Sequence, residues 1–216
     1  MWCPGVSALV TRLVYQGNMR GEGWGWGSTR YEVMAYVIPI GYGAVAYGVV
    51  WLTGLGRVDL SLFHTNVALF VVGGTVQGLI LALGEELGWR GFLVPKLAEW
   101  LTVTRTALVS GAIWAAWHVP VIAFGDYNSG TPTWYAIMCF AVAVIAMAFP
   151  LAWLRLRSGS LWPAAIMHAS HNLYIQSFFD RVTVDTGPTK YLISEFGAVL
   201  ALTMAVTAWL IWRARG

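Results

Sequence analysis

The sequence predicts an all-α fold, a polytopic membrane helix bundle with about six transmembrane helices. Of its 216 residues, 58% are hydrophobic and only 11% are charged, and the mean hydropathy is +0.64. Soluble domains carry about 25% charged residues, so this composition indicates a membrane protein. The second observation is a series of long apolar runs, because a helix needs roughly 20 apolar residues to cross a bilayer.

Six apolar runs are predicted to span the membrane. The first in chain order, Val33–Thr53, contains Pro39 and several glycines, which membrane helices tolerate. The other five approach or exceed roughly 18 residues without a charge, and they are Val67–Gly84, Ala107–Gly125, Trp134–Leu154, Leu161–Phe179 and Phe196–Trp212.

The basic residues predict how these spans are oriented. Assigning the connections alternately to two sides places ten of the thirteen basic residues together: Arg12, Arg20, Arg30, Arg90, Lys96, Arg105, Arg155, Arg157, Arg213 and Arg215. By the positive-inside rule, both termini and the opening of the site then face the cytoplasm, in what we expect to be a bacterial inner membrane. The basic residues punctuate apolar spans and form no stripe, so no nucleic-acid partner is predicted.

The first 30 residues are predicted to form an interfacial segment, residues 1–30, ahead of a transmembrane domain at 31–216. Val6, Leu9, Val10, Leu13 and Val14 follow helical amphipathic spacing, with Arg12 off that face. This pattern is typical of a helix lying on the membrane surface, and the alternative is a remnant of a longer membrane segment.

A charged cluster ends the apolar run that begins at Val67. Glu85 and Glu86 are followed by Arg90, and ionisable groups at membrane depth are usually paired or functional. The four-residue spacing places Glu86 and Arg90 on one helix face in the favourable acid-before-base order. Glu85 lies about 100° away from that pair and is the candidate working carboxylate. The alternative is that both glutamates are ordinary charges in the headgroup zone.

Two further polar groups lie inside other apolar runs. His118 follows Trp114 by one helical turn, and a lone histidine of this kind is usually a packing residue. His168 and Asn172 are four residues apart and therefore share a helix face. His171 borders that face or donates a structural hydrogen bond to a neighbouring helix.

Taken together, the carboxylate, the two histidines and the amide suit hydrolysis. Glu85 would act as a general base toward water, and His118 would orient or protonate the reacting groups. His168 and Asn172 would stabilise the oxyanion of a tetrahedral intermediate.

Three ordered motifs resemble a known family. They are Glu-Glu-x-x-x-Arg at 85–90, aromatic-x-x-x-His at 114–118 and His-x-x-x-Asn at 168–172, flanked by Gly-Trp-Arg-Gly-Phe-Leu and Ser-Gly-Ser-Leu-Trp-Pro. The set resembles the CPBP intramembrane proteases, which group type II CAAX prenyl endopeptidases with Abi-like bacterial proteins of bacteriocin processing and self-immunity. The motif core covers about residues 67–180.

The resemblance implies a transmembrane protease domain at 31–216 whose cavity lies in the cytosolic half of the bundle. It implies that Glu85 and His118 activate water and that His168 and Asn172 form the oxyanion site. The supporting residues are Glu86, Arg90, Trp114 and His171. Family members commonly have more helices before the first motif, so the N-terminal bundle is expected to be incomplete, and phenylalanine is frequent where this chain has Trp114.

No cofactor is predicted, although zinc is an alternative. Glu85, His118 and His168 could supply a two-histidine, one-carboxylate set with an open position for water. Against this, the sequence has no His-Glu-x-x-His motif. The amide of Asn172 is also better suited to hydrogen bonding a carbonyl oxygen than to a zinc shell.

The predicted function is an intramembrane endopeptidase acting on a membrane-embedded or lipidated peptide at the lipid bilayer. The substrate would be a CAAX-like prenylated peptide or a bacteriocin or leader-type peptide. A noncatalytic membrane scaffold or immunity protein that binds peptide in the same cavity is the alternative from another class. A small proton-relaying transporter has less support, because no inverted repeat is evident.

Overall fold

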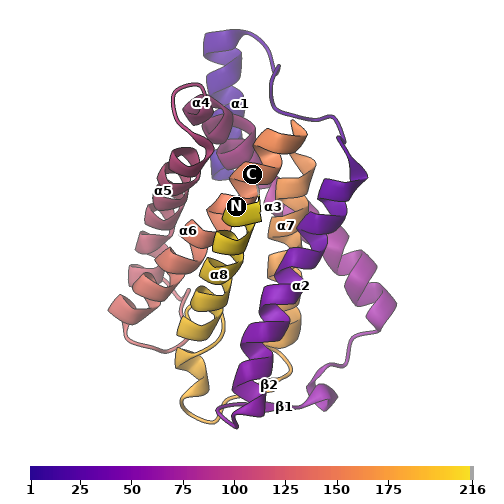
Figure 1. Ribbon diagram of the computed structural model, residues 1–216, viewed down its shortest axis with the longest axis vertical. Helices are drawn as coiled ribbons and strands as arrows, with labels where there is room; N and C mark the ends of the chain where they lie inside the picture. The colour runs from indigo at the N-terminus through magenta and orange to yellow at the C-terminus, as the bar shows by residue number, and fades with distance from the viewer. Residues whose placement is uncertain (215–216) are drawn as a thin grey trace.

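The computed structural model describes residues 1–214 as a helical bundle, which confirms the predicted fold class (Figure 1). The α-helices are α1 (Cys3–Gln16), α2 (Thr29–Leu52), α3 (Gly74–Glu86), α4 (Val94–Ala98), α5 (Val103–Phe124), α6 (Thr133–Ser158), α7 (Trp162–His171) and α8 (Ala198–Ala214). Three π-helical segments continue or precede them: η2 (Leu69–Gly73), η3 (Leu87–Leu93) and η4 (Asn172–Phe179). Two 3₁₀ turns are η1 (Leu60–Leu62) and η5 (Thr189–Tyr191).

A short antiparallel ribbon joins two connectors at one end of the bundle. Strand β1 (Arg57–Val58) pairs with β2 (Thr183–Val184), so that Arg57 lies opposite Val184. Figure 1 shows this ribbon at the end of the molecule opposite to α1 and α4. Arg12 of α1 and Lys96 of α4 thus lie at the end opposite to Arg57 of β1, as the assignment of the basic residues to two sides predicts. Arg215 lies outside the described residues, and the cytoplasmic orientation stays a prediction.

The helices differ in how well they meet the requirements for crossing a membrane. Within residues 1–214, four helical stretches are long and apolar enough: Thr29–Leu52, Leu69–Ala98, Val103–Phe124 and Thr133–Ser158. The other two predicted spans are present as helices but are weaker. Helix α8 is apolar but shorter, and the α7–η4 stretch contains His168, His171 and Asn172, which lower its hydropathy.

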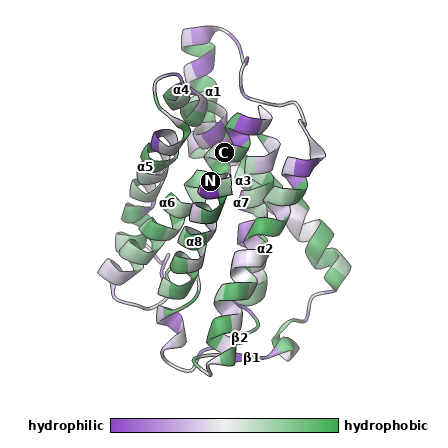
Figure 2. Cartoon of the chain, in the orientation of Figure 1, coloured by the Kyte–Doolittle hydropathy of each residue, from purple (hydrophilic) through white to green (hydrophobic). Residues whose placement is uncertain are grey.

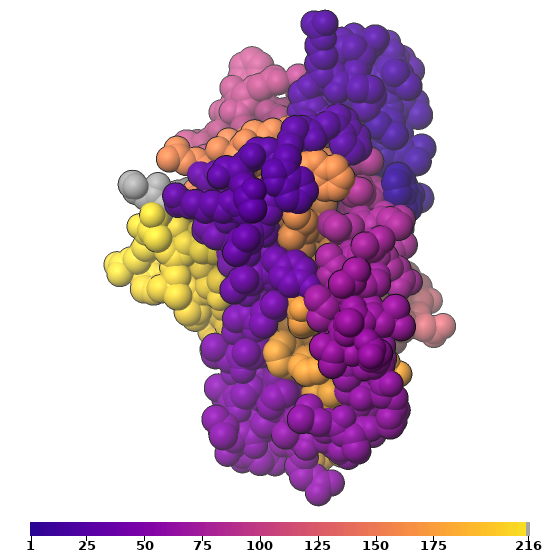
Figure 3. All heavy atoms as spheres, turned by 90° about the vertical axis from the view of Figure 1, so that its right-hand side faces the viewer, coloured from indigo at the N-terminus to yellow at the C-terminus, as the bar shows by residue number. Residues whose placement is uncertain are grey.

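Helix α6 is the centre of the bundle. Of its most apolar stretch 67% is buried, against 39% for α2 and 33% for α5. It packs against α5, α7 and α8, and Gly111 of α5 lets the two backbones approach, because an added Cβ would lie 2.8 Å from the Cβ of Ala148. Helix α7 packs against α2 and α3, and Figure 3 shows the α7–η4 segment (orange) between these two helices.

The outer faces of the long helices are apolar. Val37 and Val49 of α2, Leu108 of α5 and Leu202 of α8 are all exposed, and Figure 2 shows hydrophobic residues over the length of the bundle. Isolated soluble domains rarely expose such continuous apolar area. The exposed faces therefore suit contact with lipid.

Helix α1 turns its apolar side outward and its arginine inward. Val6, Val10 and Leu13 are exposed, whereas Arg12 is buried and forms an ion pair with Glu22. The helix packs on η3 and α3. An exposed apolar face suits a position at the membrane surface, and the buried arginine shows that α1 is also docked onto the bundle.

Two buried arginines anchor the π-helical segment that follows the glutamates. In a π-helical turn, i→i+5 hydrogen bonds replace the i→i+4 bonds of the α-helix, and such turns often occur at functional sites. In η3 the carbonyl oxygen of Arg90 accepts a hydrogen bond from Nε of Arg155 at 2.9 Å, and that of Gly91 accepts one from Nη2 of Arg12 at 3.1 Å. The helix that carries Glu85 is thus tied to α6 on one side and to α1 on the other.

Candidate active site

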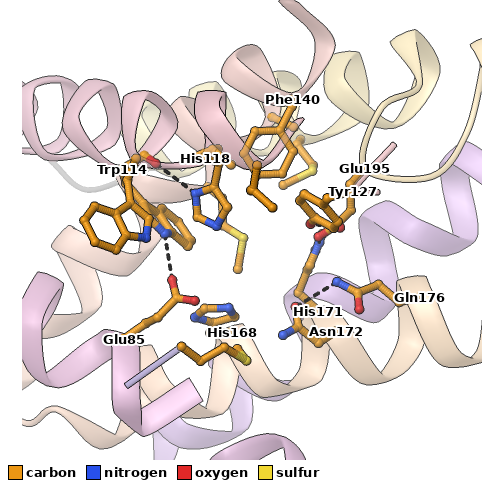
Figure 4. Close-up of a pocket in the computed structure, with 17 residues that line it drawn as sticks. Glu85, Trp114, His118, Tyr127, Phe140, His168, His171, Asn172, Gln176 and Glu195 are labelled. Carbon is orange, nitrogen blue, oxygen red and sulfur yellow. Dashed lines mark hydrogen bonds and ion pairs between the residues drawn. The ribbon is translucent and has the colours of Figure 1, made fainter. Parts of the chain in front are cut away.

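A cavity of about 390 Å³ in the bundle brings the predicted site residues together. Glu85, His118, His168 and Asn172 all line it (Figure 4). They come from α3, α5, α7 and the start of η4. The aromatic side chains of Trp114, Trp117, Tyr127 and Phe140, together with aliphatic residues and methionines, form much of the remaining wall.

Glu85 lies in the last turn of α3 and is held by two tryptophans. Its Oε2 accepts hydrogen bonds from Nε1 of Trp114 at 2.9 Å and from Nε1 of Trp89 at 3.3 Å. Both bonds end on one oxygen, so Oε1 takes no part in them. Glu85 thus makes its contacts apart from the Glu86–Arg90 ion pair, as the helical spacing predicts. Its Oε1 is left for another partner. Trp89 was not predicted, although its position four residues after Glu85 places both on one helix face.

Glu86 is fully buried and joins two of the motifs. Its Oε1 lies 2.8 Å from Nη1 of Arg90, which is the predicted pair, and 2.8 Å from Nδ1 of His168. The second contact was not predicted, because it crosses from α3 to α7. A carboxylate on one ring nitrogen fixes the orientation of a histidine. Glu86 therefore positions His168 in addition to neutralising Arg90.

Arg90 packs against the face of the Trp114 ring. The guanidinium carbon of Arg90 lies 4.1 Å from the ring centroid of Trp114, which is a cation–π contact. The same indole donates to Glu85 through its edge. Phenylalanine, which the resemblance leads one to expect at this position, could supply the ring but not the hydrogen bond, so Trp114 adds a contact to the candidate carboxylate.

His118 is oriented by its own helix and by aromatic neighbours. Its Nδ1 lies 2.9 Å from the carbonyl oxygen of Trp114, so Nδ1 donates and Nε2 is the nitrogen left for another partner. The imidazole packs against Phe140 and Tyr127, with ring centroids 5.0 Å and 6.3 Å away.

The His-x-x-x-Asn motif ends where α7 changes to a π-helix. Asn172 accepts a hydrogen bond on Oδ1 from Nε2 of Gln176 at 3.4 Å, so its amide N–H groups are oriented to donate. His171 lies 2.5 Å from the hydroxyl of Tyr42 through Nδ1, and 3.2 Å from Oε1 of Glu195 through Nε2. It both lines the cavity and binds a neighbouring helix, so the two alternatives for His171 are combined.

Glu195 is a cavity residue that the sequence did not predict. It lies in the connector before α8, beside Phe196 at the start of the last apolar run. In the sequence, Glu195 is a single carboxylate next to an apolar run, and no other charged residue or histidine lies one helical turn away to mark it as part of a site. Sequence spacing could not reveal that this connector folds back onto the cavity.

The arrangement of these side chains does not fit a zinc site. Zinc needs protein ligands at about 2.0–2.2 Å around one point. Across the part of the chain that the structure describes, no three His, Cys, Asp or Glu side chains are placed to hold a metal ion. The alternative set of Glu85, His118 and His168 lines one cavity without forming such a group, and a metal-independent reaction stays a prediction.

The fold is that of an integral membrane helix bundle, and comparison with known proteins assigns it to the protease class and to a family. The model of the type II CAAX prenyl endopeptidase Rce1-like family matches residues 66–174, which include all three motifs. The chain therefore belongs to this family, and the predicted CPBP resemblance is confirmed.

One curated relative is similar to part of the chain. CAAX prenyl protease 2 of Methanococcus maripaludis is 28% identical over 102 residues. The match covers 44% of this chain and 36% of the relative, so little more than a third of the relative's length is represented.

Proposed function

We propose that the protein is an intramembrane endopeptidase that hydrolyses a peptide bond of a prenylated, CAAX-like substrate with water activated by a glutamate. The observation that carries this proposal is the convergence of Glu85, His118, His168 and Asn172 on one cavity of a membrane bundle. Membership of the Rce1-like family supports the same reaction class.

The first step of the proposed reaction is proton abstraction from water. Oε1 of Glu85 takes a proton from a water molecule that Nε2 of His118 orients by accepting its second hydrogen. The resulting hydroxide attacks the carbonyl carbon of the substrate. The indole donors of Trp89 and Trp114 hold Oε2 and so keep the carboxylate turned toward the water.

The second step is stabilisation and collapse of the tetrahedral intermediate. Asn172 donates through its amide, and His168 donates through Nε2 to the oxyanion. Because Nδ1 of His168 already donates to Glu86, His168 can do this only as the imidazolium, a form that the adjacent carboxylate stabilises. The carbon–nitrogen bond then breaks, and the proton held by Glu85 passes to the leaving amine, which restores the carboxylate.

The proposed substrate reaches the site from the membrane. The exposed apolar helix faces suit lipid, and the family name refers to a prenyl endopeptidase. The proposed orientation places both termini and the cavity opening on the cytoplasmic side, where an excess of basic residues is expected. A bacteriocin or leader-type peptide is the alternative substrate with the same extended backbone.

A cleavage assay tests this function. The protein, reconstituted in lipid vesicles, is incubated with a farnesylated peptide ending in a CAAX sequence, and the products are identified by mass spectrometry. We expect a truncated farnesylated product, with much less from the same peptide lacking the farnesyl group. Peptide binding without any product from prenylated or leader-type peptides would instead establish a noncatalytic scaffold.

Removal of metal ions should leave this activity unchanged. A water activated by a carboxylate needs no Lewis acid, so we expect full turnover after treatment with a zinc chelator and no stoichiometric zinc by elemental analysis. The measurement is the cleavage rate before and after chelation. Activity that is lost to the chelator and restored by added zinc would overturn the metal-independent mechanism.

A further inference from the structure

A second polar cluster lies across the cavity from Glu85. It consists of Tyr42, Tyr127, His171 and Glu195, and we call it the Glu195 cluster. Figure 4 shows Tyr127, His171 and Glu195 on the side of the cavity away from Glu85 and His168. Tyr42 and Glu195 lie outside the part of the chain that matches the family.

One carboxylate connects the members of this cluster. Oε1 of Glu195 lies 3.2 Å from Nε2 of His171, and Oε2 accepts a hydrogen bond from the hydroxyl of Tyr127. Tyr42 then contacts the other ring nitrogen of His171 at 2.5 Å. The cluster therefore joins α2, α7 and two connectors that are far apart in the sequence.

Glu195 is suited to hold these partners as a charged group. Burial raises the pKa of its carboxyl, but hydrogen bonds from His171 and Tyr127 outweigh that effect and bring the pKa below its ordinary value. Hydrogen bonds to an ionised carboxylate are shorter and stronger than neutral ones. Glu195 thus binds the connector before α8 to His171 of α7 and to Tyr127 of the connector after α5.

The Tyr127 arm of the cluster ends on His118. The Tyr127 ring packs edge-on against Phe140 at 5.8 Å and Phe196 at 5.0 Å, and it contacts the imidazole of His118 at 6.3 Å. Tyr127 lies in the irregular connector after α5, where no helix defines its position. Its hydrogen bond to Glu195 is therefore a direct restraint on the wall behind His118.

The His171 arm ends beside Asn172. His171 is the last residue of α7, and Asn172 is the first residue of η4. The imidazole is held from both sides, by Tyr42 and by Glu195. This restraint acts on the residue directly before Asn172, at the change from α-helix to π-helix.

We infer that Glu195 is a positioning residue for the proposed hydrolysis. Through Tyr127 it holds His118 toward the water, and through His171 it holds Asn172 toward the oxyanion. The inference rests on the proposed function, because these are the two groups that must be aligned on one substrate carbonyl. A carboxylate outside the three motifs thereby couples the water-activating half of the site to the oxyanion half.

Kinetics of four variants test this inference. A misplacement of about 1 Å can cost on the order of 100-fold in rate, so we expect Glu195→Ala to lower kcat by this order with KM nearly unchanged. Glu195→Gln keeps an acceptor for Tyr127 and should recover part of the rate, and Tyr127→Phe should lose one arm only. The matched control is Asp59→Asn, because Asp59 also accepts side-chain hydrogen bonds, from the backbone N–H and the hydroxyl of Ser61, but does not line the cavity.

A spectroscopic measurement separates this inference from the proposed function. In protein with ¹³C-labelled histidines, the His118 signal is assigned with His118→Gln. We expect Glu195→Ala and Tyr127→Phe to shift the His118 signal, through the changed ring current of residue 127, and Asp59→Asn to leave it in place. A shift of this kind supports the positioning role even if the wild type cleaves no peptide, in which case the proposed function alone fails. An unmoved signal, or a raised KM with unchanged kcat, would overturn the inference.

Discussion

Replacing Glu85 with glutamine is expected to reduce peptide cleavage by roughly 10²- to 10⁴-fold, the usual contribution of a general base. Glutamine keeps the shape of the side chain and an acceptor for the indole donors of Trp89 and Trp114. It cannot take a proton from water at neutral pH. The loss should therefore appear in kcat, while peptide binding and the thermal unfolding temperature stay close to those of the wild type.

The control for this variant is Glu99→Gln. Glu99 pairs with Lys96 on the surface of the protein, and its side chain is about half exposed. This change removes one carboxylate of the same type without touching the cavity, and so cleavage should be unchanged. Full turnover by Glu85→Gln would show that the glutamate is not the base. Intact binding together with no cleavage by the wild type would support the scaffold alternative.

Replacing Glu86 with leucine is expected to destabilise the protein by about 3–5 kcal/mol, because it leaves one partner of a buried ion pair without its counterion. Arg90 and Glu86 are both essentially inaccessible to solvent. Nδ1 of His168 loses its acceptor in the same change. The measurement is the thermal unfolding temperature of the detergent-solubilised protein, with kcat determined on the folded fraction.

The double variant Glu86→Leu/Arg90→Leu separates the effect of Glu86 on protein stability from its effect on the orientation of His168. It removes both buried charges, and apolar replacements of buried ion pairs are often neutral or stabilising. We therefore expect the unfolding temperature to recover in part, whereas cleavage stays low because His168 still has no carboxylate to orient it. A double variant with full activity would show that the Glu86–His168 contact has no part in the reaction.

The spacing of residues within single helices was enough to predict the local pairing around Glu85. Glu86 and Arg90 are one turn apart and do form an ion pair, because neighbours on a helix surface are determined by the 3.6-residue repeat. The same rule would have found Trp89 next to Glu85. The position of Arg12 was predicted less completely: the residue lies off the apolar face as expected, yet it is buried against η3.

Contacts between helices could not be predicted in this way. Glu86 and His168 are 82 residues apart in the sequence, and Tyr42 and His171 are 129 apart. No periodic pattern relates such positions. The change from α- to π-helix at Leu87 and at Asn172 was also not predicted, since a single inserted residue in a helical turn leaves no mark on hydropathy.

The sequence by itself determined the class of the protein and the residues of its proposed chemistry. Apolar runs of membrane length define helices from composition alone, and polar residues inside those runs are costly enough to stand out individually. Only the tertiary structure decided how these residues act on one another. It placed Trp114 and Trp89 on Glu85, Glu86 on His168, and Glu195 across the cavity. The physical reason is that these contacts depend on which helix faces pack together and on where a connector folds back, and neither is encoded in local spacing.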